Sequence, residues 1–133
     1  MTPQEAFNKA YIGVIEQGGP SVSSDGRCLY RATNGRKCGV GHLFDDDALA
    51  EAWDHRNLGI HAAVGDEKAP KWMREATMSQ LLQEIQRSHD LASDDFRDQI
   101  TGEVDDEAFL EKFKEHMVDV SKHLGLAIPQ LEN

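Results

Sequence analysis

Carboxylate side chains recur at every fourth position near the C-terminal end of the chain. The four are Glu107, Glu111, Glu115 and Asp119, and on an α-helix this spacing places them in one row, about 6 Å apart. Such a row is typical of a solvated, solubilising helix face, but it would also attract a cationic surface. Like charges at this spacing destabilise a helix by roughly 0.2–0.5 kcal/mol per pair, so helix stability alone does not favour the row.

Further acidic residues precede the row and extend it into a larger candidate partner-binding region. Duplex DNA carries one charge per about 1.7 Å of its axis, so a single row at about 6 Å is too sparse to imitate it, and neighbouring segments would have to supply a second row. We name the whole candidate region the acidic surface. It consists of Asp94, Asp95, Asp98, Asp105, Asp106, Glu107, Glu111, Glu115 and Asp119.

Two cysteines and a histidine form the second group with possible chemistry. Cys38 and His42 share a face if the backbone is extended between them, whereas Cys28 joins them only if the turn between the cysteines has three residues. The group could bind zinc or carry a thiol nucleophile, but it lacks both the Cys-x-x-Cys and the His-x-x-x-His spacing. A core position is the usual place for a free cysteine, so we predict no metal, cofactor or catalytic residue here.

Composition limits the classes of partner and compartment. The 133 residues include 24 acidic and 14 basic side chains, for a net charge of -10, and 39% are hydrophobic, which suits one globular domain over 1–133. The charge argues against direct binding of nucleic acid or anionic membranes. Two cysteines, no apolar run long enough to cross a bilayer and no signal-peptide pattern predict a cytoplasmic protein without a disulfide.

The elements that must position these residues are mainly helices. Thr2, Pro3 and Glu5 predict a helix start that Gly18 ends, and Asp105 and Gly125 bound the last helix in the same way. Between them, Asp45 predicts the start of a short helix, residues 59–70 a loop, and Thr77 a further helix start. Ser93 is expected to cap a separate short helix that holds Phe96 and Ile100.

One β-hairpin is expected among these helices. Strand-like runs flank the pair Asn34-Gly35, which is a strong signal for a tight type I′ turn. We therefore predict an α+β fold that is mostly helical, with about four helices packed against one hairpin over residues 28–41. Because an isolated hairpin is marginally stable in water, it must pack against the helices.

At the hairpin the chain resembles a family of small, largely uncharacterised bacteriophage and prophage proteins. The resemblance lies in Cys28-Leu29-Tyr30-Arg31, in Gly35 to Gly41 with its Lys37-Cys38 pair, and in Leu43. A second similar segment is the leucine-rich stretch from Leu81 to His89-Asp90. The family brings no agreed activity, cofactor or catalytic residue, so what it implies is a viral origin. Small acidic phage proteins are often inhibitors of host enzymes.

These observations lead to one expected function and two alternatives. We expect a non-enzymatic phage accessory protein, in the host cytoplasm, whose acidic surface blocks a basic nucleic-acid site on a host topoisomerase such as gyrase, a nuclease, a transcription factor or a defence complex. The first alternative is a small metal- or thiol-dependent enzyme that uses Cys28, Cys38 and His42. The second is a homo-oligomeric module, for example a homodimer, that buries a patch formed by Trp72, Met73 and Met78.

Overall fold

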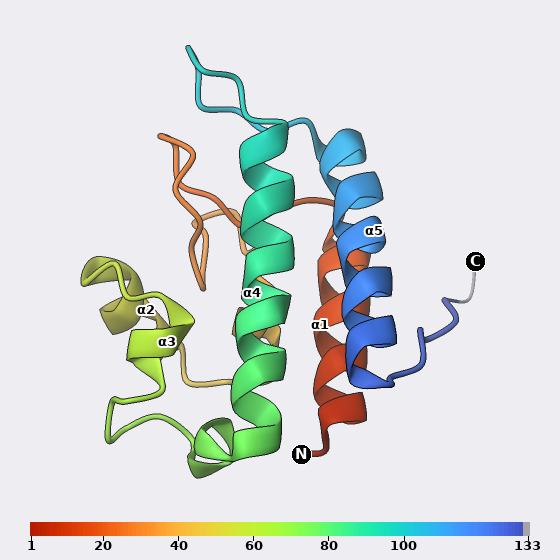
Figure 1. Ribbon diagram of the computed structural model, residues 1–133. Helices are drawn as coiled ribbons and strands as arrows, with labels where there is room; N and C mark the ends of the chain where they lie inside the picture. Colours follow the sequence, from red (N-terminus) through yellow and green to blue (C-terminus); the bar gives the residue numbers. More distant parts are fainter. Residues whose placement is uncertain (132–133) are drawn as a thin grey trace.

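The computed structural model describes residues 1–131, and in this range the chain forms five α-helices and two short 3₁₀ helices. Three long helices, α1, α4 and α5, lie side by side, with α5 antiparallel to α4, while α2 and α3 lie on the other side of α4 (Figure 1). No helix in this range is long and apolar enough to cross a membrane. The elements are α1 (Pro3–Gln17), η1 (Val40–Leu43), α2 (Asp47–His55), α3 (Ile60–Ala63), η2 (Lys71–Arg74), α4 (Ala76–Asp95) and α5 (Asp106–Leu124).

The first and last helices begin and end where their capping residues predict. The Thr2 hydroxyl accepts a hydrogen bond from the backbone N–H of Glu5 at 3.2 Å, and Gly18 ends α1 in the left-handed region with φ of 88°. The Asp105 carboxylate caps α5 by accepting from the N–H of Ala108 at 2.9 Å, and Gly125 ends that helix in the same left-handed conformation. Both predictions are confirmed, because these signals act within a few residues of the helix ends.

The fourth helix is longer than predicted and absorbs the separate helix expected after it. It begins at Ala76 and continues without interruption to Asp95, so Ser93 is a buried residue inside the helix and not a cap. Ile85, His89 and Ala92 lie on the same buried face, and this spacing carries the helix past Ser93. Phe96 and Ile100 consequently lie outside any helix, in the segment between α4 and α5.

The predicted β-hairpin over residues 28–41 is wrong. Within residues 1–131 there is no strand or sheet, only two isolated antiparallel bridges, Val22 with Cys28 and Arg97 with Val104, so the fold is helical and not α+β. The turn itself does form. The N–H of Gly35 donates to the Ala32 carbonyl and that of Ala32 donates to the Arg36 carbonyl, which gives a three-residue loop and not the type I′ pair.

No strands form on either side of this turn, because side chains from α1 and α2 bond the backbone groups that a β-ladder would need. Both oxygens of the Asp54 carboxylate accept from backbone N–H groups, those of Tyr30 and Arg31, at 2.8 and 3.0 Å. The Gln17 amide accepts from the N–H of Lys37 at 2.9 Å and donates to its carbonyl at 2.7 Å. The segment is therefore held by α1 and α2 one backbone group at a time.

The middle of the chain departs from prediction by small shifts. Asp46, and not Asp45, caps α2 by accepting from the N–H of Leu49 at 3.0 Å. The predicted loop over 59–70 contains the single helical turn α3. Helix α4 begins at Ala76 without a side-chain cap, so Thr77 lies inside it.

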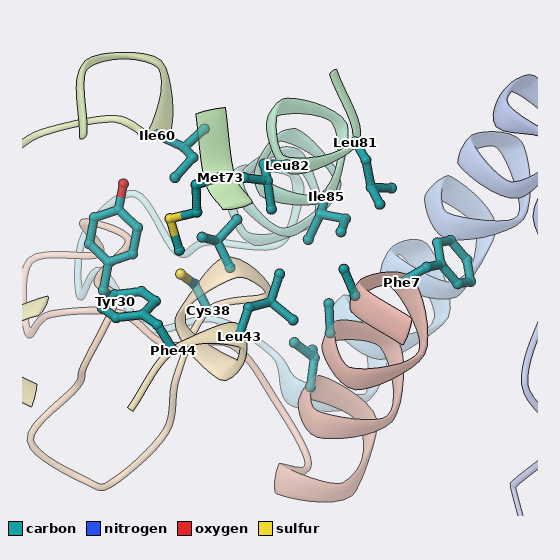
Figure 2. Packing of buried hydrophobic residues seen from close by; sticks show 14 of the residues in the cluster. Phe7, Tyr30, Cys38, Leu43, Phe44, Ile60, Met73, Leu81, Leu82 and Ile85 are labelled. Atoms are coloured by element: carbon teal, nitrogen blue, oxygen red, sulfur yellow. The ribbon is translucent and has the colours of Figure 1, made fainter. Parts of the chain in front are cut away.

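Apolar side chains from all the helices meet in one core. Figure 2 shows Cys38 and Leu43, from the segment between α1 and α2, lying between the aromatic pair Tyr30 and Phe44 and the side chains of α4. Met73 and Met78 are fully buried in the same core, and Trp72 is partly buried. The patch expected to bury itself in a homo-oligomer is thus already covered within one chain.

Candidate functional site

The acidic surface is accessible at nearly every position that the sequence assigned to it. Eight of its nine residues are exposed, and Asp106 is partly buried. Asp94 and Asp95 end α4, Asp98 lies in the connecting segment, and the remaining residues begin α5 or follow along it. The structure therefore places all nine along the end of α4, the connection and α5.

Three members of the acidic surface hold local structure through hydrogen bonds or an ion pair, and a fourth, Asp94, lies 3.9 Å from the Arg97 guanidinium. Asp106 forms a two-pronged ion pair with Arg36, with N–O distances of 2.9 and 3.1 Å, and Asp105 caps α5. The Asp98 carboxylate accepts from the backbone N–H groups of Ile100 and Thr101, which lowers its pKa. These three carboxylates hold the scaffold of the surface, and their charges are partly compensated.

The row along α5 is less compensated. Glu115 lies 3.4 Å from the Lys112 ammonium. Glu107, Glu111 and Asp119 have no ion-pair partner among residues 1–131. Most of the row is consequently available to an external cation.

A hydrogen-bonded loop between α4 and α5 displays one almost fully exposed apolar side chain, Ile100, among these charges. We call residues 96–105 the acidic loop; Figure 1 shows it protruding beyond the helix ends. The N–H of Asp98 donates to the Glu103 carbonyl at 2.7 Å and that of Gly102 donates back at 2.9 Å, with Gly102 at φ of 76°. Ile100 at the tip is 95% exposed. The sequence predicted a short helix here; the pattern Asp98 to Gly102, a turn former followed by a glycine, is the signal that could have indicated this loop.

The cysteine and histidine group proposed from sequence is not brought together. The Cys38 thiol is buried in the core and accepts from the Gly41 N–H at 3.3 Å. His42 lies against α1, 3.0 Å from the Gln17 side-chain oxygen, and burial lowers its pKa to about 4. Cys28 instead meets the side chains of His89 and Asp90 from α4, a grouping that local sequence signals do not indicate because it joins positions far apart in the chain.

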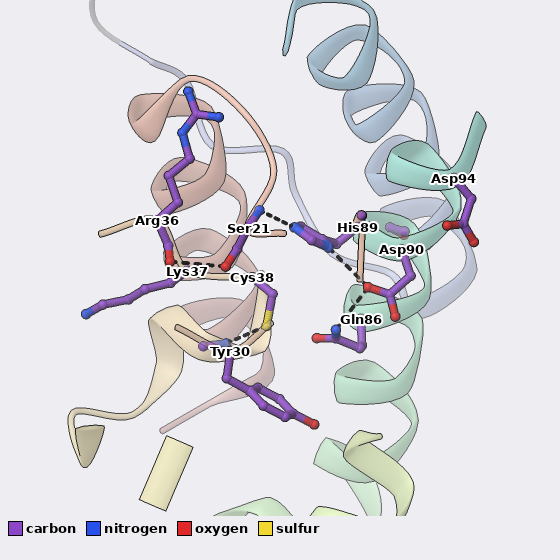
Figure 3. Close-up of polar contacts among 12 residues, drawn as sticks. Ser21, Tyr30, Arg36, Lys37, Cys38, Gln86, His89, Asp90 and Asp94 are labelled. Atoms are coloured by element: carbon purple, nitrogen blue, oxygen red, sulfur yellow. Dashed lines mark hydrogen bonds and ion pairs between the residues drawn. The ribbon is translucent and has the colours of Figure 1, made fainter. Parts of the chain in front are cut away.

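The geometry around His89 determines what this grouping can do. The backbone N–H of Ser21 donates to Nε2 of His89 at 3.1 Å, which places the ring proton on Nδ1, 3.1 Å from the Asp90 carboxylate (Figure 3). His89 is fully buried and also packs edge-on against Phe109. The ring therefore ties the segment after α1 to both α4 and α5.

Neither a thiol nucleophile nor a metal centre is favoured here. Burial, and then the Asp90 carboxylate, raise the pKa of the Cys28 thiol, whereas nucleophilic cysteines need a lowered pKa. A metal on Nδ1 of His89 would require the proton to move to Nε2, where the Ser21 N–H already points. Cys28, His89 and Asp90 are the one cluster of three possible ligands among residues 1–131, so the donor set does not suit a metal at this point.

A cavity of about 360 Å³ opens beside the cluster. Its wall includes Cys28 and Tyr30 from the segment after α1, Trp53 and Asp54 from α2, and Asp90 from α4. The Tyr30 and Trp53 rings meet edge to face, with centroids 5.5 Å apart. The cavity thus combines aromatic walls with carboxylates.

Comparison with known proteins adds no assignment. No family model matches the chain, and no curated protein or solved structure is significantly similar to it. The resemblance to bacteriophage proteins accordingly stays a prediction. The acidic surface and the cavity are therefore the features that bear on function.

Proposed function

We propose that the protein acts without catalysis, by binding and inhibiting a basic, nucleic-acid-binding surface of a host protein. The acidic surface makes the contact, and the setting is the cytoplasm of a cell infected by a bacteriophage. The observation that carries the proposal is the position of Ile100. This large apolar side chain is 95% exposed at the tip of a hydrogen-bonded loop, between clusters of carboxylates.

Ile100 supplies the anchor of the interface. Burying an isoleucine side chain in an apolar pocket contributes about 1.5–3 kcal/mol. The acidic loop is closed by backbone hydrogen bonds at both Asp98 and Gly102, so little conformational entropy is lost when its tip is fixed by a partner. The partner therefore has an apolar pocket within a basic surface.

The carboxylates supply orientation and speed of association. Charges of opposite sign across an interface increase the association rate more than they increase the final affinity. The row on α5 is sparser than a DNA backbone, and the acidic residues at the end of α4 and in the loop lie near its first turn instead of along its length. DNA mimicry here consists of competing for the same basic surface, while Ile100 provides the specificity.

Capture of a partner with matched variants tests the proposal. The immobilised protein is incubated with host lysate at about 50 and 500 mM salt, and captured proteins are challenged with duplex DNA. We expect a nucleic-acid-binding protein that is lost at high salt, is displaced by DNA, and is bound at least tenfold more weakly by Ile100→Ser and by the triple change of Glu107, Glu111 and Glu115 to lysine.

Two controls make the result specific. Leu91→Ser removes another partly exposed apolar side chain, on α4, and Glu67→Lys reverses an exposed charge outside the acidic surface. Both should retain the partner. Retention of every captured protein by the Ile100 and triple variants would contradict the proposal.

A further inference from the structure

The cavity beside Cys28 unites the two segments that stand out in the sequence, and the proposed inhibition does not use it. Cys28 and Tyr30 belong to the first segment, and Gln86 and Asp90 to the leucine-rich stretch that ends in His-Asp. The cavity measures about 360 Å³, which lies within the range of sites for small molecules or single side chains.

Negative charge prevails in its wall. The charged lining residues comprise four aspartates and two arginines, a formal excess of two negative charges; they are Asp25, Asp54, Asp90, Asp94, Arg27 and Arg97. Asp54 has both oxygens engaged by backbone N–H groups. Asp90 and Asp94 are four residues apart on α4, which places them on one helix face about 6 Å apart.

Asp90 is held in place for binding. One of its carboxylate oxygens accepts hydrogen bonds from both the Gln86 amide and His89, each at 3.1 Å. His89 is itself fixed by the Ser21 backbone (Figure 3). These bonds orient the carboxylate while its side chain stays 40% exposed. The Cys28 thiol also contacts this carboxylate.

A hydrogen-bond acceptor without a partner and two aromatic residues complete the cavity wall. The Gln86 side-chain oxygen is buried without a hydrogen-bond partner among residues 1–131 and is turned away from Asp90 in Figure 3. A buried polar atom without a partner is unfavourable, so the Gln86 side chain would gain from a donor that reached its oxygen. Tyr30 and Trp53 also line the cavity, and aromatic rings in a wall favour a cation over an anion.

We propose that this cavity binds a guanidinium or primary ammonium group. Such a group offers several N–H donors to Asp90 and Asp94, and its positive charge is opposite to the negative excess of the wall. A metal ion fits less well because the Ser21 N–H occupies Nε2 of His89 and leaves the proton on Nδ1. Arg97 lies 3.9 Å from Asp94, a distance at which an incoming cation can share that carboxylate.

Titration with agmatine, which carries both groups, tests the inference by ¹H–¹⁵N NMR of the full chain. We expect saturable shifts of the backbone amides of Cys28 and Asp90 and of the Trp53 indole N–H. Butylurea, which is similar in shape but uncharged, should cause no saturable shift. Asp90→Asn should weaken agmatine binding at least tenfold, because its carbonyl keeps both internal hydrogen bonds but loses the charge.

Two further variants separate an effect on agmatine binding from an effect on folding. One lies far from the cavity, and the other lies in its wall at a more exposed position. Asp119→Asn removes the same charge from the row on α5 and should bind agmatine within twofold of the wild type. If Asp90→Asn does not fold, Asp94→Asn, whose side chain is 58% exposed, should weaken binding at least threefold. Absence of saturable shifts with agmatine, equal shifts with butylurea, or unchanged affinity in a folded variant at Asp90 or Asp94 would overturn the inference.

A competition experiment identifies the source of the cationic group and keeps this inference apart from the proposed function. If the group is an arginine or lysine of the inhibited partner, saturating agmatine should release that partner and Asp90→Asn should bind it more weakly. If the group belongs to a free metabolite, agmatine should bind while capture is unchanged. Agmatine binding does not depend on Ile100. A protein that captures no partner can therefore still bind agmatine, and one that does not bind agmatine can still capture a partner, so the two proposals can fail independently.

Discussion

The Cys28 thiol lies beside a histidine and a carboxylate, but its surroundings keep it protonated. A thiolate at this position would be buried and would face the Asp90 carboxylate, and both effects raise the pKa of the thiol. The other cysteine, Cys38, is fully buried, and burial raises its pKa to about 12. The hydrogen bonds of His89 to Ser21 and Asp90 leave it no lone pair to accept the thiol proton. Proximity alone therefore does not make a nucleophile.

Both cysteines should resist alkylation and disulfide exchange in the folded protein. Because the thiolate is the reactive form, we expect reaction with Ellman's reagent at pH 8 to be at least about 100-fold slower in native protein than in guanidinium. Release of two equivalents on unfolding is the positive control, since both cysteines are free. A fast native reaction that Cys28→Ser abolishes would contradict this description of the thiol.

His42 should make the stability of the protein fall in mild acid. Burial, followed by the charges of Lys37 and Arg31, lowers its pKa to about 4 from an ordinary value of 6.5. Between these two values the unfolded chain binds a proton that the folded chain does not, so unfolding becomes easier as pH falls from 6.5 towards 4. The Tm of His42→Gln should decline less over this range than the wild-type Tm. Parallel declines would show that His42 does not carry the effect.

Side-chain hydrogen bonds replace a β-sheet in holding the segment between α1 and α2. Gln17 from α1, Asp54 from α2 and His89 from α4 each bond its backbone. Arg31, within the segment, donates to the carbonyls of Gly41 and Phe44 at 2.6 Å each. A few polar side chains on separate helices thus fix the position of Cys28 and Tyr30 in the cavity wall.

Asp54→Asn should destabilise the fold through the loss of an acceptor. Burial raises the pKa of Asp54, so its charge is not favourable in itself, but an asparagine would present an NH₂ group to one of the two backbone N–H groups. We expect a loss of about 1–3 kcal/mol in urea unfolding. Asp47→Asn on the same helix, which breaks an exposed pair with Arg31, should cost clearly less than Asp54→Asn, because exposed ion pairs contribute little to stability. Equal losses would argue against the anchoring role.

The elements that the sequence predicts well are those determined by local signals. Thr2, Gly18 and Asp105 act on backbone groups within four residues of themselves, so α1 and α5 follow from the sequence. The hairpin prediction failed because Gln17 and Asp54, distant in sequence, take up the backbone groups of a ladder. The exposure of the acidic residues could be predicted since exposed helical positions repeat regularly, whereas the cavity depends on three segments, residues 25–30, 53–59 and 86–97, that only the tertiary fold brings together.

The whole molecule carries a net charge of -10, and its distribution affects both stability and association. Three pairs of like charges, four residues apart, follow one another in the row on α5. The expected homo-oligomer patch is largely covered, because Met73 and Met78 are fully buried. Self-repulsion and the lack of that patch both favour a single chain, which sedimentation equilibrium at micromolar concentration should detect as a monomer.

Moderate salt should stabilise the protein while it weakens partner binding. Raising the salt from about 10 to 150 mM shortens the screening length from about 30 to 8 Å, which relieves repulsion within the row, so we expect the wild-type Tm to rise. Glu111→Gln removes two of the three repulsive pairs and should raise the Tm at low salt by about 2–4 °C, corresponding to roughly 0.4–1 kcal/mol. The Tm of Glu111→Gln should then rise less than the wild-type Tm when the salt concentration is raised.

Glu67→Gln, at an exposed position outside the helices, removes the same charge and should keep the wild-type response to salt. A response of Glu111→Gln equal to that of the wild type would show that lysines 112, 114 and 122 already neutralise the row. If the expected result holds, salt moves stability and partner binding in opposite directions. Loss of a captured partner at high salt then reflects screening of the interface and not unfolding of the protein, because the folded state is more stable under the condition that releases the partner.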